Sequence, residues 1–266
     1  MLDTNVIILL CLTGAVTGFC AGLFGIGGGG IMVPILAVIF SHMAFPADHL
    51  MHFALGTSMA AIIPTATASI IAHQKHKAIL WPVVLKFVPG VLLGTYLGSL
   101  IANHLSNYFL AIFFSVFMAI VAWKMWSNRL PVASQDLPST PLLSFVGTFI
   151  GGISALVAIG GGTMTVPFLL WSNIRLQSAI ATSAAVGLPI ALTGAISYAS
   201  HLSASIDGIS FGYLVWPAVL SLAAGSIITA PLGARLAHRL PTEKLKRYFA
   251  IFLLFLSVQM LVKLVW

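Results

Sequence analysis

Long apolar stretches, separated by short polar connections, make up most of the chain. They cover residues 6–24, 31–41, 50–72, 79–102, 107–126, 142–158, 163–172, 177–199, 211–234 and 246–264. Most of them are long enough for a helix to cross the hydrocarbon core of a bilayer, which takes about 20 residues. The pattern therefore predicts an all-α polytopic membrane protein.

Two of the stretches, residues 31–41 and 163–172, are too short to cross a bilayer, and each directly follows a run of glycines. At 1.5 Å per residue, a helix of this length covers about 15 Å, roughly half of the core. We predict that each is the returning arm of a re-entrant helix hairpin whose bend is the glycine run.

The glycine run belongs to a motif that occurs twice. GIGGGGIMVPIL begins at Gly25, and AIGGGTMTVPFL begins at Ala158, 133 positions later. Other landmarks follow in the same order in both halves, namely Thr57-Ser58 with Thr182-Ser183, Pro64 with Pro189, and Trp81-Pro82 with Trp216-Pro217. We predict a first repeat at residues 1–126 and a second at 142–266, joined by a cytoplasmic linker at 127–141. In each repeat, three spanning helices follow the hairpin.

Lysines and arginines indicate the topology because they accumulate in cytoplasmic loops. If each glycine segment crossed the membrane once, five basic residues would face one side and six the other. If each is a hairpin, ten face one side and only Lys263 the other. The ten are Lys75, Lys77, Lys124, Arg129, Arg175, Arg235, Arg239, Lys244, Lys246 and Arg247. The bias predicts repeats of inverted topology, with both termini on the non-cytoplasmic side.

The glycine runs are candidates for an anion site. Half-helices that begin at the glycines direct free N–H groups and positive dipole ends toward the centre of the molecule. Pro34 and Pro167 are expected in or near the first turn of these arms, where proline costs little. The alternative is that glycines only allow close helix packing, which we assign to the glycines spaced by four: Gly14, Gly18 and Gly22; Gly90, Gly94 and Gly98; Gly147 and Gly151.

Other polar residues in the spans leave two interpretations open. The hydroxyls of the two Thr-Ser pairs either bond within the helices or face a cavity as donors to a substrate. Lys86 lies inside a span, where it either snorkels to the interface or adds positive charge near a substrate path. His73 and His76 accompany Lys75 and Lys77 in a basic connection, which we interpret as a solvated loop.

Composition narrows the function. The chain is 59% hydrophobic and only 6% charged, against about 25% charged in soluble domains. The net charge of +7 is spread over many loops, so no nucleic-acid partner is expected. Every acidic residue falls in a terminus or a connection, a distribution that favours an anion over a cation as solute.

Chemistry at a reactive centre is not indicated. His49 and His52 are three apart without a third ligand, so no metal site is predicted. Gly25, Gly27 and Gly30 fit GxGxxG, but the βαβ context of a dinucleotide site is missing, so no cofactor is expected. No nucleophile paired with a base lies in a span, and we predict that the protein is not an enzyme.

The doubled motif, in GFCAGLFGIGGGGIMVPIL and GGISALVAIGGGTMTVPFL, and the ALGTS and AIATS stretches that follow resemble the TauE/SafE sulfite exporter family, also called the 4-toluene sulfonate uptake permease family. The resemblance implies a multi-pass permease of a prokaryotic cytoplasmic membrane that moves sulfite or organosulfonates. By matching position it implies substrate contacts from Gly27, Gly28, Gly29, Thr57, Ser58, Gly160, Gly161, Gly162, Thr163, Thr182 and Ser183. Thr163 stands where the first copy has Gly30, so the two half-sites differ.

These observations predict a secondary transporter that works by alternating access at a midplane site between the two half-helix ends. Its partners are a small anionic sulfur-containing solute and the lipid bilayer. The alternative is an anion channel or a non-transporting membrane assembly protein in which the glycines serve helix packing. The sequence leaves open the exact solute, the direction of transport, the coupling ion and whether the protein forms an oligomer.

Overall fold

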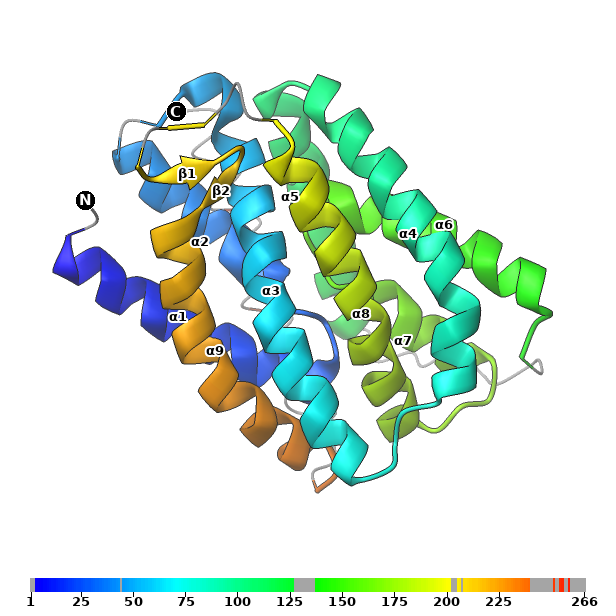
Figure 1. Cartoon of the computed structure of the whole chain (residues 1–266). Coiled ribbons are helices and arrows are strands. Elements are labelled where there is room, and N and C mark those ends of the chain that lie inside the picture. The colour runs from blue at the N-terminus through cyan, green and yellow to red at the C-terminus, as the bar shows by residue number, and fades with distance from the viewer. Residues whose placement is uncertain are drawn as a thin grey trace.

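The computed structural model describes residues 3–43, 45–126, 137–201, 205–206 and 208–239, together with 251, 254, 255 and 258. Helices account for most of these residues (Figure 1). They are α1 (Thr4–Phe24), α2 (Gly29–His42), α3 (Leu50–Lys75), α4 (Trp81–His104), α5 (Asn107–Trp126), α6 (Thr140–Val157), α7 (Gly162–Trp171), α8 (Leu176–Ala199) and α9 (Trp216–Ala237). A 3-10 turn, η1 (Ala47–His49), precedes α3, and a short antiparallel hairpin of β1 (Ser210–Phe211) and β2 (Leu214–Val215) precedes α9.

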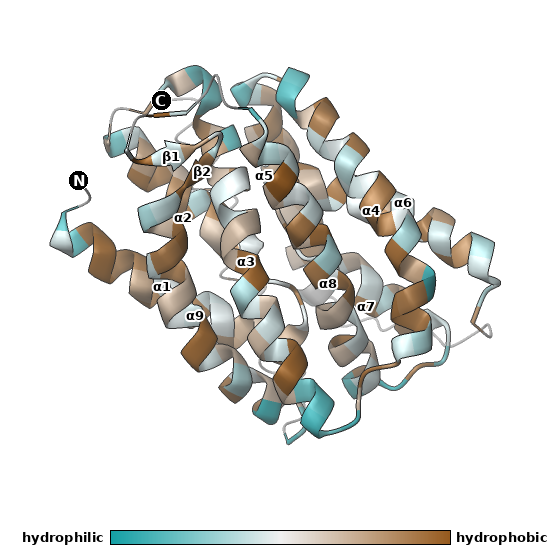
Figure 2. Ribbon diagram, viewed as in Figure 1, coloured by the Kyte–Doolittle hydropathy of each residue, from teal (hydrophilic) through white to brown (hydrophobic). Residues whose placement is uncertain are grey.

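Seven of the described helices are long and apolar enough to cross a membrane, whereas α2, with 14 residues, and α7, with 10, are shorter. The all-α polytopic prediction is confirmed, and the chain breaks at both predicted glycine runs. Large apolar side chains face outward, among them Leu85, Phe145 and Ile228. Figure 2 shows hydrophobic colour along the middles of the helices and hydrophilic colour mainly at their ends. Most of the predicted span at 246–264 and most of the predicted linker lie outside the described residues.

The centre of the molecule is formed by α3 and α8, which pack together and run in opposite directions (Figure 1). Every residue from 51 to 62 in α3 and from 179 to 187 in α8 is buried. Uninterrupted burial of this kind requires protein on all sides of a helix rather than on one face.

The first helix of each half packs on the fourth helix of the other half: α1 lies along α9, and α6 lies along α4. Glycines make the close approach feasible. A methyl group on Gly18 would lie 2.5 Å from the Ser226 Cα, and one on Gly94 would overlap the Thr148 carbonyl oxygen. Close backbone contact at small residues is the usual way in which membrane helices associate. The packing role predicted for the glycines spaced by four is confirmed.

Two threonines show which helix ends lie together. The hydroxyl of Thr182 accepts a hydrogen bond from the Leu80 N–H at 3.1 Å, so the start of α8 lies beside the start of α4. The hydroxyl of Thr57 accepts one from the Val215 N–H, also at 3.1 Å, so the starts of α3 and α9 lie together. The first of these regions, which we call the basic end, is where α3 and α9 stop, and it carries Lys75, Lys77, Arg175, Arg235 and Arg239.

Candidate functional site

The two glycine runs form loops that share positive φ at their first and last residues and differ between them, where Gly27 has positive φ and the matching Gly160 does not. The first glycine loop, Gly25 to Gly28, has positive φ at Gly25, Gly27 and Gly28. The second glycine loop, Ala158 to Gly161, has positive φ at its first and last residues. Gly28 and Gly161 are the N-caps of α2 and α7, with φ/ψ of 82°/−12° and 75°/−15°. Residues with a side chain rarely adopt this conformation, which explains why glycine is needed at both caps.

The two loops touch each other through their backbones. A methyl group on Gly27 would lie 2.7 Å from the Gly160 nitrogen and 2.8 Å from its Cα. Methyl groups on Gly29 and Gly162 would overlap the carbonyl oxygens of Ala158 and Gly25, respectively. The contact is thus reciprocal, and the expectation that the two glycine turns meet is fulfilled.

Helices α2 and α7 both begin at this contact and leave backbone groups unpaired there. The first hydrogen bonds onto the caps are made by Ile31 and Met32 to the Gly28 carbonyl, and by Met164 and Thr165 to the Gly161 carbonyl. Among the described residues, none accepts a hydrogen bond from the N–H groups that precede these, on Gly29, Gly30, Gly162 and Thr163. Four donors and two positive helix ends therefore gather at one place.

The prolines lie one turn further into the helices than a proline that presets a helix start. Pro34 and Pro167 are each the sixth residue of their helix, so they occupy the second turn. A proline there has no N–H to offer the carbonyl four residues earlier. The carbonyls of Gly30 and Thr163 consequently lose their regular helical partner, which adds acceptors beside the four donors.

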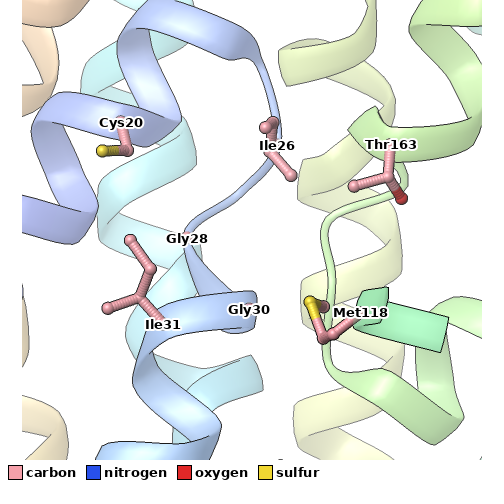
Figure 3. Close-up of a pocket in the computed structure, with 7 residues that line it drawn as sticks. All are labelled: Cys20, Ile26, Gly28, Gly30, Ile31, Met118 and Thr163. Carbon is pink, nitrogen blue, oxygen red and sulfur yellow. The ribbon is translucent and has the colours of Figure 1, made fainter. Parts of the chain in front are cut away.

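A small pocket opens beside the loops and is lined by residues of both halves (Figure 3). Thr163 of α7 faces it together with Gly28 and Gly30, and Met118 of α5 lies at its edge. Cys20, Ile26 and Ile31 complete the lining. The pocket has room for roughly one water molecule. An anion of the size of sulfite can enter this pocket only if the surrounding elements move apart.

Both threonines of the Thr-Ser pairs are used by the fold. Thr57 accepts from the Val215 N–H and lies 3.4 Å from the Tyr213 carbonyl oxygen, and Thr182 accepts from the Leu80 N–H. Val215 and Leu80 are the N-caps of α9 and α4, so each hydroxyl caps a helix. Buried N–H groups at helix starts need such partners. Of the two interpretations of these threonines, the structure provides the contacts of the structural one.

The serines differ from each other. Ser183 donates to the Gly25 carbonyl oxygen at 3.2 Å and so ties α8 to the first glycine loop. Ser58, at the matching position of the first repeat, is fully buried, and its hydroxyl has no partner among the described residues. A buried hydroxyl normally has a partner, so Ser58 differs in this respect from the other three hydroxyls of these pairs.

Lys86 lies apart from the buried core. It is exposed on α4, next to the exposed Leu85. A long side chain on the outer face of a spanning helix extends its amine toward the interface, and this position agrees with the snorkelling interpretation.

A buried histidine near the loops was not anticipated from the sequence. The prediction that His73 belongs to a solvated loop is wrong, because His73 lies in the last turns of α3 and is fully buried. Its Nε2 lies 3.0 Å from the Gly22 carbonyl oxygen, three residues before the first glycine loop. The neighbouring Lys75 and Lys77 made this position look solvated in the sequence. Its match with Tyr198, at the same spacing that relates Thr57 to Thr182, was the available signal.

No group of three or more metal-ligating side chains occurs in the part of the chain that the structure describes. The site consists of backbone N–H and C=O groups, hydroxyls and apolar side chains. Such a set can bind a solute by hydrogen bonds and helix dipoles.

Seven described helices are long enough to cross a membrane, and the short helices α2 and α7 meet at their N-termini among them. This arrangement defines a polytopic membrane protein, and the comparisons with known proteins identify its family. The model of the sulfite exporter TauE/SafE family matches residues 10–260. The chain belongs to this family, and it is a membrane transporter.

Relatives extend across bacteria and archaea. A protein of Haemophilus influenzae named "Probable membrane transporter protein" is 37% identical over 262 residues, which cover 96% of this chain and 98% of the relative. A protein of Methanocaldococcus jannaschii with a name of the same kind is 28% identical and covers 90% of this chain and 89% of its own. The protein YunE of Bacillus subtilis, also named a probable membrane transporter, is 24% identical over 96% of this chain and 97% of its own. No solved structure matches the chain.

Proposed function

We propose that this transporter moves small sulfur-containing anions, such as sulfite or organosulfonates, as a secondary carrier. The observation that carries the proposal is the backbone contact of the two glycine loops, at which α2 and α7 both begin. Each helix start is equivalent to about half a positive charge, and its free N–H groups are suited to oxyanions. The sulfite exporter name of the family and the absence of acidic residues from the predicted spans agree with an anionic solute.

We further propose that residues 1–126 and 142–266 are inverted repeats, with α1–α2 and α6–α7 as re-entrant hairpins. The opposite directions of α3 and α8, and the exchange of partners by which α1 lies on α9 and α6 on α4, support this arrangement. The basic end then faces the cytoplasm, as does the linker at 127–141, and both termini lie outside it. The single-crossing alternative would place Arg175 and Lys75 on opposite sides, whereas both belong to the basic end.

The proposed mechanism is alternating access. In the described conformation the pocket beside the loops holds only about one water molecule, so this mechanism requires the pocket to open. When the repeats rock apart on one side, the N–H groups of Gly29, Gly30, Gly162 and Thr163 become available to an oxyanion, and the hydroxyls of Thr163 and Ser58 add donors. In this mechanism Gly27, Gly28, Gly160 and Gly161 shape the loops, and Thr57, Thr182 and Ser183 hold the walls.

The test is counterflow of labelled sulfite in proteoliposomes that contain the purified full-length protein. We expect saturable counterflow, which a carrier shows and an open channel does not. Gly28→Val and Gly161→Val should abolish it, because valine is strained at positive φ and a side chain on Gly28 would lie 3.1 Å from Thr17 Cβ.

Gly152→Ala provides the control, because the described atom nearest to a methyl group there is the Gly94 carbonyl oxygen, at an ordinary 3.6 Å. The amount of each variant in the membrane is measured alongside. Flux that does not saturate would favour the channel alternative. Unchanged counterflow in both valine variants would remove the glycine loops as the site.

A further inference from the structure

The two halves secure the same turn with different chemistry. In the first half, His73 on α3 bonds to the carbonyl of Gly22, three residues before the first glycine loop. In the second half, the hydroxyl of Tyr198 on α8 donates to the carbonyl of Ala155 at 3.0 Å, three residues before the second glycine loop. One of these donors titrates near neutral pH, whereas a tyrosine, with an ordinary pKa of about 10, does not.

The hydrogen bonds fix the protons on His73. A carbonyl only accepts, so His73 Nε2 must carry the hydrogen that bonds to the Gly22 oxygen. The other ring nitrogen, Nδ1, lies 3.2 Å from Nε2 of His238, which follows α9. In the neutral imidazole this Nδ1 is an acceptor, so His238 donates to it. A directed chain runs from His238 through His73 to the end of α1.

This chain limits how many protons the pair can hold. One additional proton can bind to Nδ1 of His238 without breaking any bond. A second would have to bind to Nδ1 of His73, where it would meet the N–H of His238. A hydrogen bond needs an acceptor, so two N–H groups cannot stay 3.2 Å apart as a bonded pair. When both rings are protonated, His238 and the end of α9 must therefore move away from α3.

The surroundings favour the neutral pair. The ring centroids of His76 and His238 lie 4.3 Å apart with the rings tilted by 33°. Burial, and after it the charge of His76, lowers the pKa of His238. The basic side chains near the pair in sequence are Lys75, Lys77, Arg235 and Arg239, all exposed. α1 presents the Gly22 carbonyl, with Cys20 as its nearest ionisable group in sequence. The ionisable groups of α2 and α8, which also pack on α3, are His42 and Tyr198, both in the last turn of their helices.

No described carboxylate offsets these groups. Asp3 precedes α1, and Asp48 lies in η1 before α3, at the opposite end of α3 from His73.

We propose that His73 and His238 form the proton-binding site that couples this transporter to a pH gradient. The inference rests on the proposed function and names its coupling ion. Protonation of both rings separates the end of α9 from α3 at the basic end. Because α1 packs along α9, this movement loosens the support of the first glycine loop, while Tyr198 keeps the second loop fixed. Because the closed pair excludes the second proton, closure is favoured above the histidine pKa, and opening of the basic end is favoured below it.

The second half supplies the design of the test. The position that corresponds to His238 is Asn103, whose side-chain nitrogen lies 3.3 Å from His201 Nδ1. The variant H73Y/H238N therefore copies the chemistry of the second half into the first. His73→Gln keeps a donor and an acceptor but cannot take up a proton. His201→Gln, at the position that corresponds to His76, is the matched control.

Two quantities are measured in proteoliposomes that contain the purified protein. The first is the exchange of labelled sulfite with equal pH on both sides of the membrane. The second is the accumulation of labelled sulfite under an imposed pH gradient, in each direction. We expect the gradient to drive accumulation in the wild type and in His201→Gln. In H73Q and in H73Y/H238N, accumulation should fall to the level without a gradient, while exchange at equal pH persists. The proposal would be overturned if accumulation by the wild type did not depend on the pH gradient, or if accumulation by the variants still depended on it.

A second measurement is independent of transport. Spin labels at Lys75→Cys and Arg239→Cys, in a chain with Cys11→Ala and Cys20→Ala, report the distance between α3 and α9 at the basic end. We expect the distance to increase between about pH 8 and about pH 5.5, on either side of the ordinary histidine pKa. With H73Q added it should stay at its high-pH value.

A distance that does not change with pH refutes the proton site even if sulfite exchange is normal. A pH-dependent distance without any sulfite exchange supports the proton site and refutes the proposed solute instead.

Discussion

At the scale of single residues, hydroxyls at matching positions of the two halves have different hydrogen-bond partners. Thr57 and Thr182 each supply the acceptor for a helix-capping N–H, Ser183 bonds to the first glycine loop, and Ser58 has no described partner. The recurrence of the Thr-Ser pair in both halves was visible in the sequence. Which hydroxyl bonds to the backbone depends on the approach of α9 and α4, segments distant in the chain, and periodicity carries no information on it.

Removal of a capping hydroxyl should lower stability. We expect Thr57→Val and Thr182→Val each to cost about 1–3 kcal/mol, because a buried N–H, on Val215 or Leu80, loses its partner. The apparent melting temperature in detergent checks this. Thr67→Val is the control, since that exposed hydroxyl bonds, among the described residues, only to the Ile63 carbonyl of its own helix. Equal melting temperatures in all three variants would contradict a capping role.

The buried His73 shows a second limit of residue-level prediction. A histidine two positions from a lysine looks solvated, yet the end of α3 is covered by α1 and by the residue that follows α9. Only the alignment of the two halves, which sets His73 opposite Tyr198, gives a sequence signal for it.

At the scale of elements, the breaks were predictable and the partners were not. Four consecutive glycines cannot continue a helix without cost, and both predicted breaks occur. Glycines spaced by four predict a packing face, but they do not say which helix covers it. That α1 is covered by α9 depends on the topology of the whole chain. The prolines lie in the second turn because the helices begin at Gly29 and Gly162, earlier than a proline-led start.

The interface between α4 and α6 offers a sharp test of close packing. We expect Gly94→Ala to destabilise the protein by about 1–3 kcal/mol, because its methyl group overlaps the Thr148 carbonyl oxygen and the helices must separate. Gly152→Ala, on the facing helix, should be neutral, since its methyl group meets the Gly94 oxygen at 3.6 Å. Thermal unfolding monitored by size-exclusion chromatography distinguishes the two. A similar loss of stability in both variants would show that the distance from the added methyl group to the facing backbone does not govern this interface.

At the scale of the whole molecule, the charge distribution and the fold agree. The basic residues of the described chain that the hairpin topology assigns to one side include Lys75, Arg175 and Arg239, and the contacts between α3, α4, α8 and α9 bring these helix ends together. The charge count alone could favour this topology but could not show that the ends adjoin. Most of the last predicted span, which contributes to the charge count, lies outside the described residues.

Cysteine labelling tests the topology in intact cells. In a chain with Cys11→Ala and Cys20→Ala, we expect His104→Cys to react with a membrane-impermeant maleimide. Lys75→Cys and Arg175→Cys should react only after the cells are opened. All three positions are exposed in the structure. Arg175 is decisive, because a single crossing by each glycine segment would make it reactive in intact cells while Lys75 stays protected.

The exchange of partners between the halves also affects biosynthesis. Helix α1 is made first, but the helix that covers its glycine face, α9, leaves the ribosome about 200 residues later. Until then the glycine face of α1 contacts only lipid or the translocation machinery. A first half that is released before α9 is made cannot bury this face. The nascent protein is therefore incomplete in its packing almost until its synthesis ends, and truncated chains expose a glycine-lined surface that cellular quality control can recognise.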